Sequence, residues 1–371
     1  MPTTLIVTND FPPRRGGIES FVLDVCGFLD NDVVVFTSAT PDSADLDRHL
    51  DFEVVRAGPI LLPTPAATRR ATGLLRRSGA QRVVFGAAAP LGLMARALRA
   101  AGATRIVGLT HGHETWWASV PGARPLLRRL ADGCDHLTTI SDFAAAKIGP
   151  ALSSDARSRL LRLPPPVDLH VFRPAPGRND HVPPRCISVG RLVPRKGFAS
   201  LLVAWRQVID QWIDPSMPPE LILVGGGPER GRIERLIGEL DVGHTVRLTG
   251  VLARAGVLKE LQAADVFAMP VHTRLGGLNA EGLGLVFAEA AACELPVVVG
   301  NSGGAPETVI DQVSGFVVDP HDHRQIAARL GRLLADRPLA RSMGAAGRAL
   351  VATKFSAEQA RATLRRALDL P

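Results

Sequence analysis

The segment Cys186–Gly197, with the sequence CISVGRLVPRKG, decides the fold. It opens with a short apolar run, continues through a loop that contains glycine and basic residues, and leads into an apolar helical pattern at about Phe198. Short apolar runs between helical segments are typical of parallel strands that are buried on both faces. The segment therefore predicts a strand, loop and helix of an α/β domain.

The same rhythm extends along the chain in both directions. The apolar runs predict further strands at 220–224, 246–248, 266–268, 296–299 and 315–318 after this segment, and at 5–8, 33–37, 83–85, 106–109 and 136–140 before it. Helices fit between these runs, so each half of the chain predicts a Rossmann-like domain with a parallel sheet.

Seven prolines crowd residues 163–185, where no apolar periodicity is visible, and this stretch predicts a linker. A chain of 371 residues also exceeds the size of one ordinary core. We expect an N-terminal domain at 1–168 and a C-terminal domain at 169–355. The helical pattern at 356–371 predicts a terminal helix, and although the pattern does not reveal its docking site, we expect it to cross back onto the first domain.

The composition describes a folded, cationic protein. Hydrophobic residues make up 46% of the chain, and the formal net charge is +7, which favours phosphate, nucleic acid or an acidic membrane as partner. The four cysteines lack Cys-x-x-Cys spacing, so neither a disulfide framework nor a zinc site is indicated. Cysteines without a disulfide pattern make a reducing cytoplasm the simplest compartment. The first eight residues lack a signal-peptide pattern, and no stretch is long and apolar enough for a membrane span, so any contact with a bilayer is expected to be peripheral.

Two motifs in the first half follow strands directly. Gly16 and Gly17 lie at a strand-to-helix turn, where backbone N–H groups can approach an anion, although a plain tight turn is the alternative. His111, His113 and Glu114 follow the strand at 106–109, where an α/β sheet places ligand groups. They suit acid–base chemistry or a structural polar loop; metal binding is disfavoured because the two histidines would point in opposite directions if the strand continued.

Two further motifs lie in the second half. Arg191 and Lys196 follow the strand at 186–189 and suit a diphosphate, with a solvated basic loop as the alternative. Glycines 225–227 follow the next strand and would allow a ligand to approach closely. The spacing Gly-x-Gly-x-x-Gly is absent there, so a dinucleotide-dependent dehydrogenase is the lesser hypothesis.

The most specific motif runs from Gly276 to Glu289 and contains two glutamates, Glu281 and Glu289, in apolar surroundings. If this segment were helical throughout, the two carboxylates would lie near one face, about 12 Å apart along the axis. A carboxylate in such surroundings needs a partner, which argues against two ordinary surface glutamates.

Five motifs stand in a recognisable order: Asn9–Pro13, Gly112–Glu114, Arg191–Gly197, Glu281–Gly284 and Ser302–Thr308. The chain thereby resembles the GT-B glycosyltransferases, in particular the large retaining family, glycosyltransferase family four, that contains sucrose synthase and bacterial lipid mannosyltransferases. Within that family it looks most like the actinobacterial GDP-mannose-dependent phosphatidylinositol monomannoside mannosyltransferases. The resemblance implies two Rossmann-like domains that face each other across a deep cleft, with the acceptor on the first and the nucleotide sugar on the second.

The resemblance also implies roles for individual residues. Arg191 and Lys196 would hold the donor diphosphate close to the backbone of Gly16 and Gly17. Glu281 would contact the hydroxyls of the transferred sugar, His113 would contact its 6-hydroxyl, and Glu289 would contact the ribose. The backbone of Gly277, Leu278 and Asn279 would also contact the sugar, and Val251 would line the base pocket. Leu275 departs from the family pattern, which often has glycine there.

The implied reaction transfers mannose from GDP-mannose to phosphatidylinositol monomannoside in an α-1,6 linkage, with retention and without a metal ion or other cofactor. Departure of the nucleoside diphosphate develops negative charge that a fixed arginine–lysine pair can stabilise. No covalent nucleophile is evident in the motifs, so we expect a short-lived oxocarbenium ion that is attacked from the face of the leaving group.

Residues 60–131 contain eleven arginines and a single acid, Glu114, which gives a net charge of +10. Such a patch suits the anionic inner face of the plasma membrane and predicts peripheral association, with a merely solvated basic face as the alternative. A soluble sugar or inositol phosphate is the rival acceptor. A nucleic-acid-binding protein is disfavoured because the chain has no tyrosine and no recognisable binding module.

Overall fold

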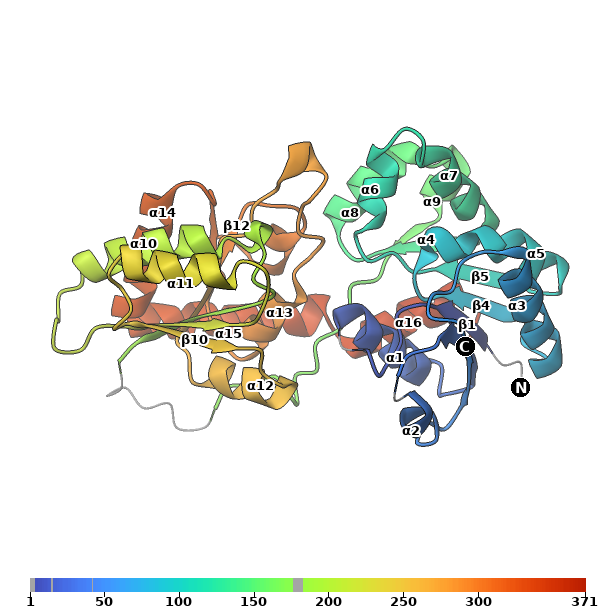
Figure 1. Cartoon of the computed structure of the whole chain (residues 1–371), viewed down its shortest axis with the longest axis horizontal. Coiled ribbons are helices and arrows are strands. Elements are labelled where there is room, and N and C mark those ends of the chain that lie inside the picture. Colours follow the sequence, from blue (N-terminus) through green and yellow to red (C-terminus); the bar gives the residue numbers. More distant parts are fainter. Residues whose placement is uncertain (1–3, 15, 42, 176–182) are drawn as a thin grey trace. The chain divides into compact units, whose positions relative to one another are not determined.

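The structure is a computed structural model that describes residues 4–14, 16–41, 43–175 and 183–371. The chain divides into two compact units (Figure 1). The first unit comprises Met1–Pro166 together with Ala357–Pro371, and the second comprises Val167–Ser356. The chain therefore passes between units twice, after Pro166 and after Ser356.

The first unit is built around a parallel sheet with the strand order β3-β2-β1-β4-β5-β6-β7. Its strands are β1 (Thr4–Thr8), β2 (Val33–Ser38), β3 (Glu53–Ala57), β4 (Arg82–Phe85), β5 (Arg105–Gly108), β6 (His136–Thr139) and β7 (Leu160–Arg162). Its helices are α1 (Gly17–Phe28), α2 (Ser43–Asp47), α3 (Pro65–Ser78), α4 (Ala88–Leu91), η1 (Gly92–Met94), α5 (Ala95–Ala100), α6 (Glu114–Ser119), α7 (Arg124–Gly133), α8 (Asp142–Ile148), η2 (Gly149–Ala151), α9 (Ser154–Ser158) and α16 (Ala357–Ala367).

Alternate residues of the central strands supply two apolar clusters, one on each face of this sheet. Leu5 and Val7 of β1 pack with α3, α5 and α7. Ile6, which lies between them in the sequence, packs instead with α1 and α16. The sheet is thus buried on both faces, as its continuous apolar strands require.

The second unit is also built around a parallel sheet, with the strand order β10-β9-β8-β11-β12-β13. Its strands are β8 (Arg185–Val189), β9 (Glu220–Val224), β10 (Val246–Gly250), β11 (Val266–Met269), β12 (Val297–Gly300) and β13 (Gly315–Val318). Its helices are η3 (Pro194–Lys196), α10 (Phe198–Asp210), α11 (Arg230–Glu239), α12 (Arg254–Gln262), η4 (Leu275–Gly277), α13 (Leu285–Ala292), η5 (Ala305–Thr308), α14 (His323–Ala335) and α15 (Arg337–Lys354).

Helices α10, α11 and α14 pack on one face of the second sheet, against residues such as Val266 and Ala268 of β11. The side chain between these two residues, Phe267, meets Phe287 of α13 edge to face at 5.6 Å between ring centroids, so α13 lies on the other face. Two Rossmann-like α/β units result, and this prediction from the sequence is confirmed.

The strands predicted from apolar runs are confirmed, but β3 and β7 escaped prediction. Both are edge strands of the first sheet. Every residue of β3 and β7 is half-buried or exposed, and each strand ends in or contains an arginine. A strand covered on one side only does not need a continuous apolar run, so the sequence signal is weak there.

The predicted linker at 163–185 is in part a packed segment. The Val167 amide donates to the Phe355 carbonyl over 2.9 Å, and Phe172 is buried in the second unit. Arg348 of α15 donates to the carbonyls of Leu169 and Phe172 over 3.1 and 2.9 Å. The sequence did not predict this packing, because the segment is held by side-chain and carbonyl contacts and forms no helix or strand that periodicity could indicate. Residues 176–182 of the predicted linker lie outside the described residues.

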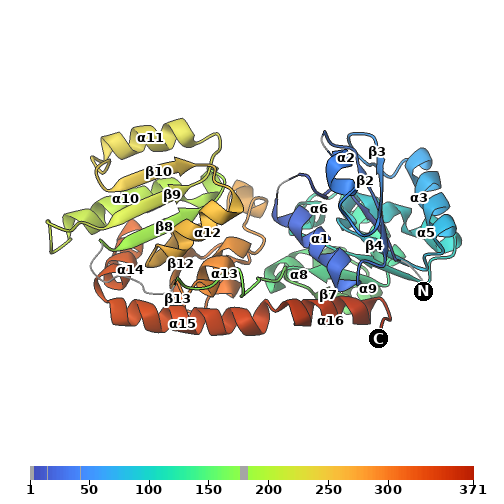
Figure 2. The same ribbon diagram turned by 90° about the horizontal axis from the view of Figure 1, so that it is seen from below.

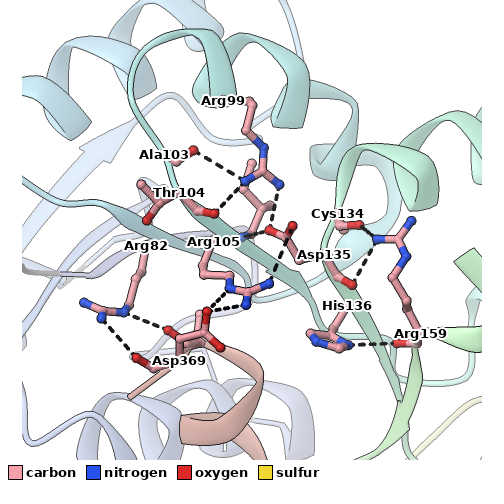
Figure 3. Close-up of polar contacts among 12 residues, drawn as sticks. Arg82, Arg99, Ala103, Thr104, Arg105, Cys134, Asp135, His136, Arg159 and Asp369 are labelled. Atoms are coloured by element: carbon pink, nitrogen blue, oxygen red, sulfur yellow. Dashed lines mark hydrogen bonds and ion pairs between the residues drawn. The ribbon is translucent and has the colours of Figure 1, made fainter. Parts of the chain in front are cut away.

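The C-terminal helix α16 belongs to the first unit and lies beside α1 (Figure 2). Leu364 and Leu368 are fully buried there. Figure 3 shows how the following residues are held: the Arg82 side chain donates to the Leu368 and Asp369 carbonyls, and Arg105 pairs with the Asp369 carboxylate.

No helix in the described part of the chain is long and apolar enough to cross a membrane.

Candidate functional site

The strand order of the second unit creates a point where successive connections leave in opposite directions. From β8 the chain proceeds outward to β9 and β10, whereas β11 pairs with the other side of β8. In open α/β sheets, ligands bind at the carboxyl ends of the strands beside such a point. The loops that follow β8 and β11 are therefore the candidate site, and they contain Arg191, Lys196 and residues 270–281.

A buried ion-pair cluster joins these two loops. The Lys196 Nζ atom lies 2.8 Å from Oε2 of Glu281, and the guanidinium of Arg195 donates to the same oxygen over 3.0 Å. Lys196 and Glu281 are each only 8% exposed. A buried carboxylate and ammonium need each other because either charge alone would be costly to desolvate. Lys196 and Glu281, predicted as site residues from separate motifs, are thus brought together.

Arg195 was not among the predicted site residues, whereas Arg191, predicted as the partner of Lys196, is exposed and makes no ion pair with any described residue. Both arginines lie in the same basic loop. The sequence signal for Arg195 was its position directly before Lys196, but two neighbouring cations give no hint of which one turns inward.

The local backbone explains how Lys196 reaches Glu281. The short helix η3 ends at Gly197, whose φ is +74° and whose added Cβ would lie 2.1 Å from the Pro270 carbonyl oxygen. The His272 amide donates to the Arg195 carbonyl over 2.9 Å. Only glycine allows this close approach at a positive φ, and the loops after β8 and β11 are consequently fastened backbone to backbone.

The glycines at 225–227 have a steric role in the fold that the sequence did not predict. An added Cβ at Gly225 would lie 1.9 Å from the Gly190 carbonyl oxygen, and one at Gly227 would lie 2.5 Å from that of Leu192. The Leu192 amide donates to the Gly226 carbonyl over 2.9 Å. Gly225 and Gly227 make room for the loop that carries Arg191, and the approach of a ligand to them stays a prediction.

The proposed helical spacing of the two glutamates is also wrong. Helix α13 begins at Leu285, so Glu281 lies in the loop before it and Glu289 alone is helical. The Gly304 amide donates to the Glu281 carbonyl over 2.9 Å, and this contact sets the Glu281 backbone. The interruption comes from Gly284, whose φ of +79° stops the helix from extending toward Glu281.

Glu289 is half-buried on α13, and the charge that acts on it is that of Arg254 rather than that of Lys196. Burial raises the pKa of Glu289 above its usual value, and Arg254 of α12 opposes that shift. A carboxyl whose pKa is raised by burial is suited to meeting polar groups of a ligand.

The segment 274–279 forms a short excursion closed by a bridge between Arg274 and Asn279. Gly276 and Gly277 have φ values of +59° and +98°, and Leu275, a non-glycine residue, has a φ of +53°. Leu278 is 41% exposed, so its side chain is available at the surface. The backbone groups of Gly277, Leu278 and Asn279 in this excursion are the ones that the resemblance assigns to the sugar.

Val251 lies at the end of β10 and is 81% exposed. An added Cβ at Gly226 would come within 2.7 Å of its side chain, which places Val251 over the loop that follows β9. It lies at the same edge of the sheet as Lys196, where the carboxyl ends of the parallel strands meet.

In the first unit, Gly16 precedes α1 as its N-cap in an extended conformation, with a φ of 179°. An added Cβ at Gly16 would meet the Glu19 carboxylate at 2.2 Å, whereas at Gly17 it would meet nothing within 4 Å. Only Gly16 is thus sterically confined, and its neighbour is a flexible side chain.

The histidine motif lies beyond the end of β5, which finishes at Gly108. Because the strand does not continue, the predicted opposite orientation of the histidines is wrong: the rings of His111 and His113 stack at 6.3 Å and 25°. Burial lowers the pKa of His111, against the opposing effect of Glu114, and its Nε2 atom lies 2.5 Å from the Gly86 carbonyl oxygen. Neutral His111 therefore donates to Gly86.

Glu114 is fully buried at the start of α6. Its Oε2 atom accepts a hydrogen bond from the His111 amide over 3.0 Å, and its Oε1 atom lies 3.1 Å from Nε2 of His113. His113 itself is exposed on 44% of its side chain. Among the described residues, no group of three or more metal-ligating side chains is present.

A cavity of about 500 Å³ lies elsewhere in the second unit, lined by residues that include Trp212, Ile213 and Arg332. It contains none of the predicted site residues.

Comparison with known proteins gives two matching family models. Residues 15–171 match glycosyltransferase family 4, and residues 174–350 match the glycosyl transferases group 1 model.

Two curated relatives match almost the whole chain. A GDP-mannose-dependent monoacylated α-(1-6)-phosphatidylinositol monomannoside mannosyltransferase of Corynebacterium glutamicum is 40% identical over 96% of this chain and 94% of its own length. A GDP-mannose-dependent α-(1-6)-phosphatidylinositol monomannoside mannosyltransferase of Mycobacterium tuberculosis is 39% identical over 96% of this chain and 95% of its own length.

Among solved structures, sucrose-phosphate synthase from Thermosynechococcus elongatus superposes with a TM-score of 0.80 at 23% identity, covering 98% of each chain. HepE from Anabaena, in complex with UDP, superposes with a TM-score of 0.81 at 18% identity, covering 99% of each chain. These two likenesses show the shared GT-B fold. The sequence relatives and family models together show that the chain is an enzyme that belongs to the group 1, family 4 glycosyltransferases.

Proposed function

We propose that this enzyme transfers mannose from GDP-mannose to phosphatidylinositol monomannoside, forming an α-1,6 linkage with retention of configuration. The proposal is supported by the relatives that carry this activity in their names at 39 to 40% identity over 96% of the chain. In it the second unit binds the donor and the first unit binds the acceptor, and the candidate residues of the first unit are His113, Gly16 and Gly17.

The Lys196–Glu281 pair is the observation that carries this proposal. Both cations of the cluster contact Oε2 of Glu281, and its Oε1 atom accepts no hydrogen bond from the described residues. One carboxylate oxygen thus holds both Lys196 and Arg195, a cluster that keeps a net positive charge, while the other oxygen can accept from a sugar hydroxyl. A diphosphate and an attached hexose require this combination of a cation beside a hydrogen-bond acceptor.

Catalysis in this proposal is assistance to the leaving group. Lys196 is preorganised by Glu281, and Arg191 is exposed on the same loop, where its guanidinium can close on a phosphate oxygen. Stabilising the developing charge on GDP without moving the protein lowers the barrier to cleavage of the glycosidic bond. The carbohydrate then passes through an oxocarbenium ion without a metal ion, and a glycosyl-enzyme adduct detected by mass spectrometry would contradict this route.

The other predicted residues are assigned to parts of the donor. Glu289 would contact the ribose, Val251 the base, and Gly277, Leu278 and Asn279 the sugar. Support comes from their positions at or beside the carboxyl edge of the second sheet and from the exposure of Val251 and Leu278.

The direct test is transfer of radiolabelled mannose from GDP-mannose to purified phosphatidylinositol monomannoside, with the product identified by mass spectrometry. Lys196→Ala and Arg191→Ala are each expected to lower kcat/KM by about a hundredfold or more, because each removes charge stabilisation from the leaving group. The matched control is Arg235→Ala, which removes an exposed arginine on α11 of the same unit. Transfer of the sugar to free inositol phosphate would overturn the assignment, and so would a preference for a UDP-sugar over GDP-mannose as the donor.

We propose further that the first unit meets an anionic membrane through α3, α5 and α7. The structure divides the eleven arginines of residues 60–131. Arg77, Arg99 and Arg105 are paired with the acids Glu53, Asp135 and Asp369, so these three are not free cations. Seven exposed arginines on the three helices make no ion pair with a described residue: Arg69, Arg70, Arg76, Arg96, Arg124, Arg128 and Arg129.

Helices α3, α5 and α7 share one face of the first sheet, so these seven arginines can act together on a surface. Each contributes about 1 kcal/mol at an anionic membrane. Arg128→Glu is expected to reduce flotation with vesicles that contain anionic lipid, whereas Arg366→Glu, an equal charge change on α16 of the opposite face, is expected to leave it intact. Equal binding to neutral and anionic vesicles would overturn the membrane proposal.

A further inference from the structure

The buried carboxylate of Glu114 is not explained by the fold. It lies in the first turn of α6 with no exposed surface, although a carboxylate in such a place costs free energy unless it is paired. Its Oε2 atom is satisfied by the His111 amide. Its Oε1 atom accepts no aligned hydrogen bond from the described residues, and the Nε2 atom of His113 stands 3.1 Å from it.

We propose that Glu114 is a positioning residue that fixes the ring of His113 and its tautomer. The inference rests on the proposed function, because it gives His113 a defined task in that reaction. A carboxylate oxygen has only lone pairs to offer, and an unprotonated ring nitrogen 3.1 Å away would repel it, so the proton of the ring belongs on the nitrogen nearest to Glu114. In neutral His113 the proton is therefore on Nε2, and Nδ1 is left as an acceptor.

This tautomer decides what His113 can do to a sugar. With its Nδ1 atom unprotonated, His113 accepts a hydrogen bond from a substrate hydroxyl and cannot donate one. The 44% exposure of the His113 side chain leaves the ring open to a ligand, while Glu114 behind it is closed to water. Acceptor character at this position selects a hydroxyl over an ether or carbonyl oxygen.

The neighbouring histidine supports the arrangement. His111 stacks on His113, and its own Nε2–H is committed to the Gly86 carbonyl. Burial lowers the pKa of His111, so the stacked neighbour is neutral and does not compete with His113 for the Glu114 charge. The His113 ring is therefore the one that the Glu114 carboxylate positions.

A double-mutant cycle tests whether Glu114 acts through His113. Glu114→Gln keeps the shape and the acceptor for the His111 amide, but its amide group can donate to Nε2 and favour the other tautomer. We expect kcat for mannose transfer to fall about tenfold to a hundredfold with KM for GDP-mannose within about twofold of the native value. In a His113→Ala background the same substitution should cost no more than about twofold. Additive losses would overturn the proposal.

A second readout does not depend on activity. In protein labelled with ¹⁵N-histidine, the His113 resonances, assigned by their loss in His113→Ala, should show a protonated Nε2 and an unprotonated Nδ1 at a pH where the ring is neutral. Glu114→Gln should shift the population toward protonated Nδ1. A native His113 with its proton on Nδ1 would refute the inference even if mannose transfer is confirmed, and failure of transfer would leave this measurement valid.

Thr110→Val is the matched control for loosening of the loop. It removes a different buried hydrogen bond of the same segment, from the Thr110 hydroxyl to the Thr138 carbonyl over 2.7 Å. We expect it to lower the thermal midpoint while the His113 tautomer is unchanged. If Thr110→Val shifted the tautomer as Glu114→Gln does, Glu114 would have a structural role only.

Discussion

At the scale of single residues, the proposed site depends on charges that are buried because they are paired. Glu281 holds Lys196 and Arg195 within 3.0 Å, and a pair of this kind contributes little beyond what its desolvation costs. The consequence is asymmetric: removing Glu281 alone leaves two cations without their counter-ion, whereas removing Glu281 and Lys196 together leaves only Arg195, the less buried of the two.

Glu281→Gln is therefore expected to lower the free energy of unfolding of the second unit by about 3 kcal/mol. Combining it with Lys196→Met should cost less than the sum of the two single changes. Trp205 and Trp212 report on this unit, so urea unfolding can be followed by fluorescence in a background where Trp116 and Trp117 are replaced by phenylalanine. Strict additivity of the two changes would contradict coupling between Lys196 and Glu281.

His111 gives the first unit a dependence on pH. Burial holds the pKa of His111 below its usual value, so between that lowered pKa and about 6.5 the unfolded chain binds more protons than the folded one. The free energy of unfolding should accordingly fall as pH drops through this window, and this contribution is fully present above about pH 7.5.

The check is the thermal midpoint of the first unit, followed through Trp116 and Trp117, between pH 7.5 and 5.5. His111→Gln should flatten the slope, because glutamine can donate to the Gly86 carbonyl without titrating. His49→Gln, at an exposed histidine of the same unit, should not change it. A native slope that survives His111→Gln would assign the acid sensitivity to another group.

At the scale of elements, glycines determine how the loops of the second unit meet. Gly303 has a φ of +62°, and an added Cβ would lie 1.9 Å from the Glu281 carbonyl oxygen. Gly276 has nearly the same φ, +59°, with nothing within 4 Å. Alanine would adopt a strained left-handed backbone at either position. Its Cβ would collide with the Glu281 carbonyl only at position 303.

Gly276→Ala is expected to cost about 1 kcal/mol from its left-handed conformation alone. Gly303→Ala should cost about 3 kcal/mol or more and weaken GDP binding, because Glu281 must move. Urea unfolding of the second unit and calorimetric titration with GDP measure both effects. Equal costs at the two glycines would show that the Gly303 contact does not hold Glu281.

At the scale of the whole molecule, the C-terminus is part of the first core. Leu364 of α16 is fully buried with Phe21 and Val25 of α1, although more than 300 residues separate them in the chain. The first unit is therefore incomplete until the last helix has been made.

Leu364→Ala should lower the free energy of unfolding of the first unit by about 2–4 kcal/mol and leave that of the second unchanged. Arg366→Ala, an exposed position on the same helix, should cost less than about 0.5 kcal/mol. Separate tryptophan reporters for the two units distinguish these outcomes. A loss shared equally by both units would mean that α16 stabilises more than the core in which it lies.

The elements that could be predicted from the sequence are those whose signal is local. Buried parallel strands such as β1 and β12 need continuous apolar runs, so their positions were readable. Edge strands β3 and β7 lack that requirement and were missed. Helix α13 starts at Leu285 rather than before Glu281 because of one glycine in a left-handed conformation, which periodicity alone does not reveal.

The sequence by itself determined the two α/β units, the family motifs, and Lys196 and Glu281 as candidates at strand ends. Only the tertiary structure decided that these two residues meet, that Arg195 rather than Arg191 joins them, and that Glu114 lies behind His113. It also decided which arginines are free and which are paired with Asp135 or Asp369. The physical reason is that apolar periodicity and glycine positions act over a few residues, whereas the partner of a buried charge is chosen by packing between distant segments.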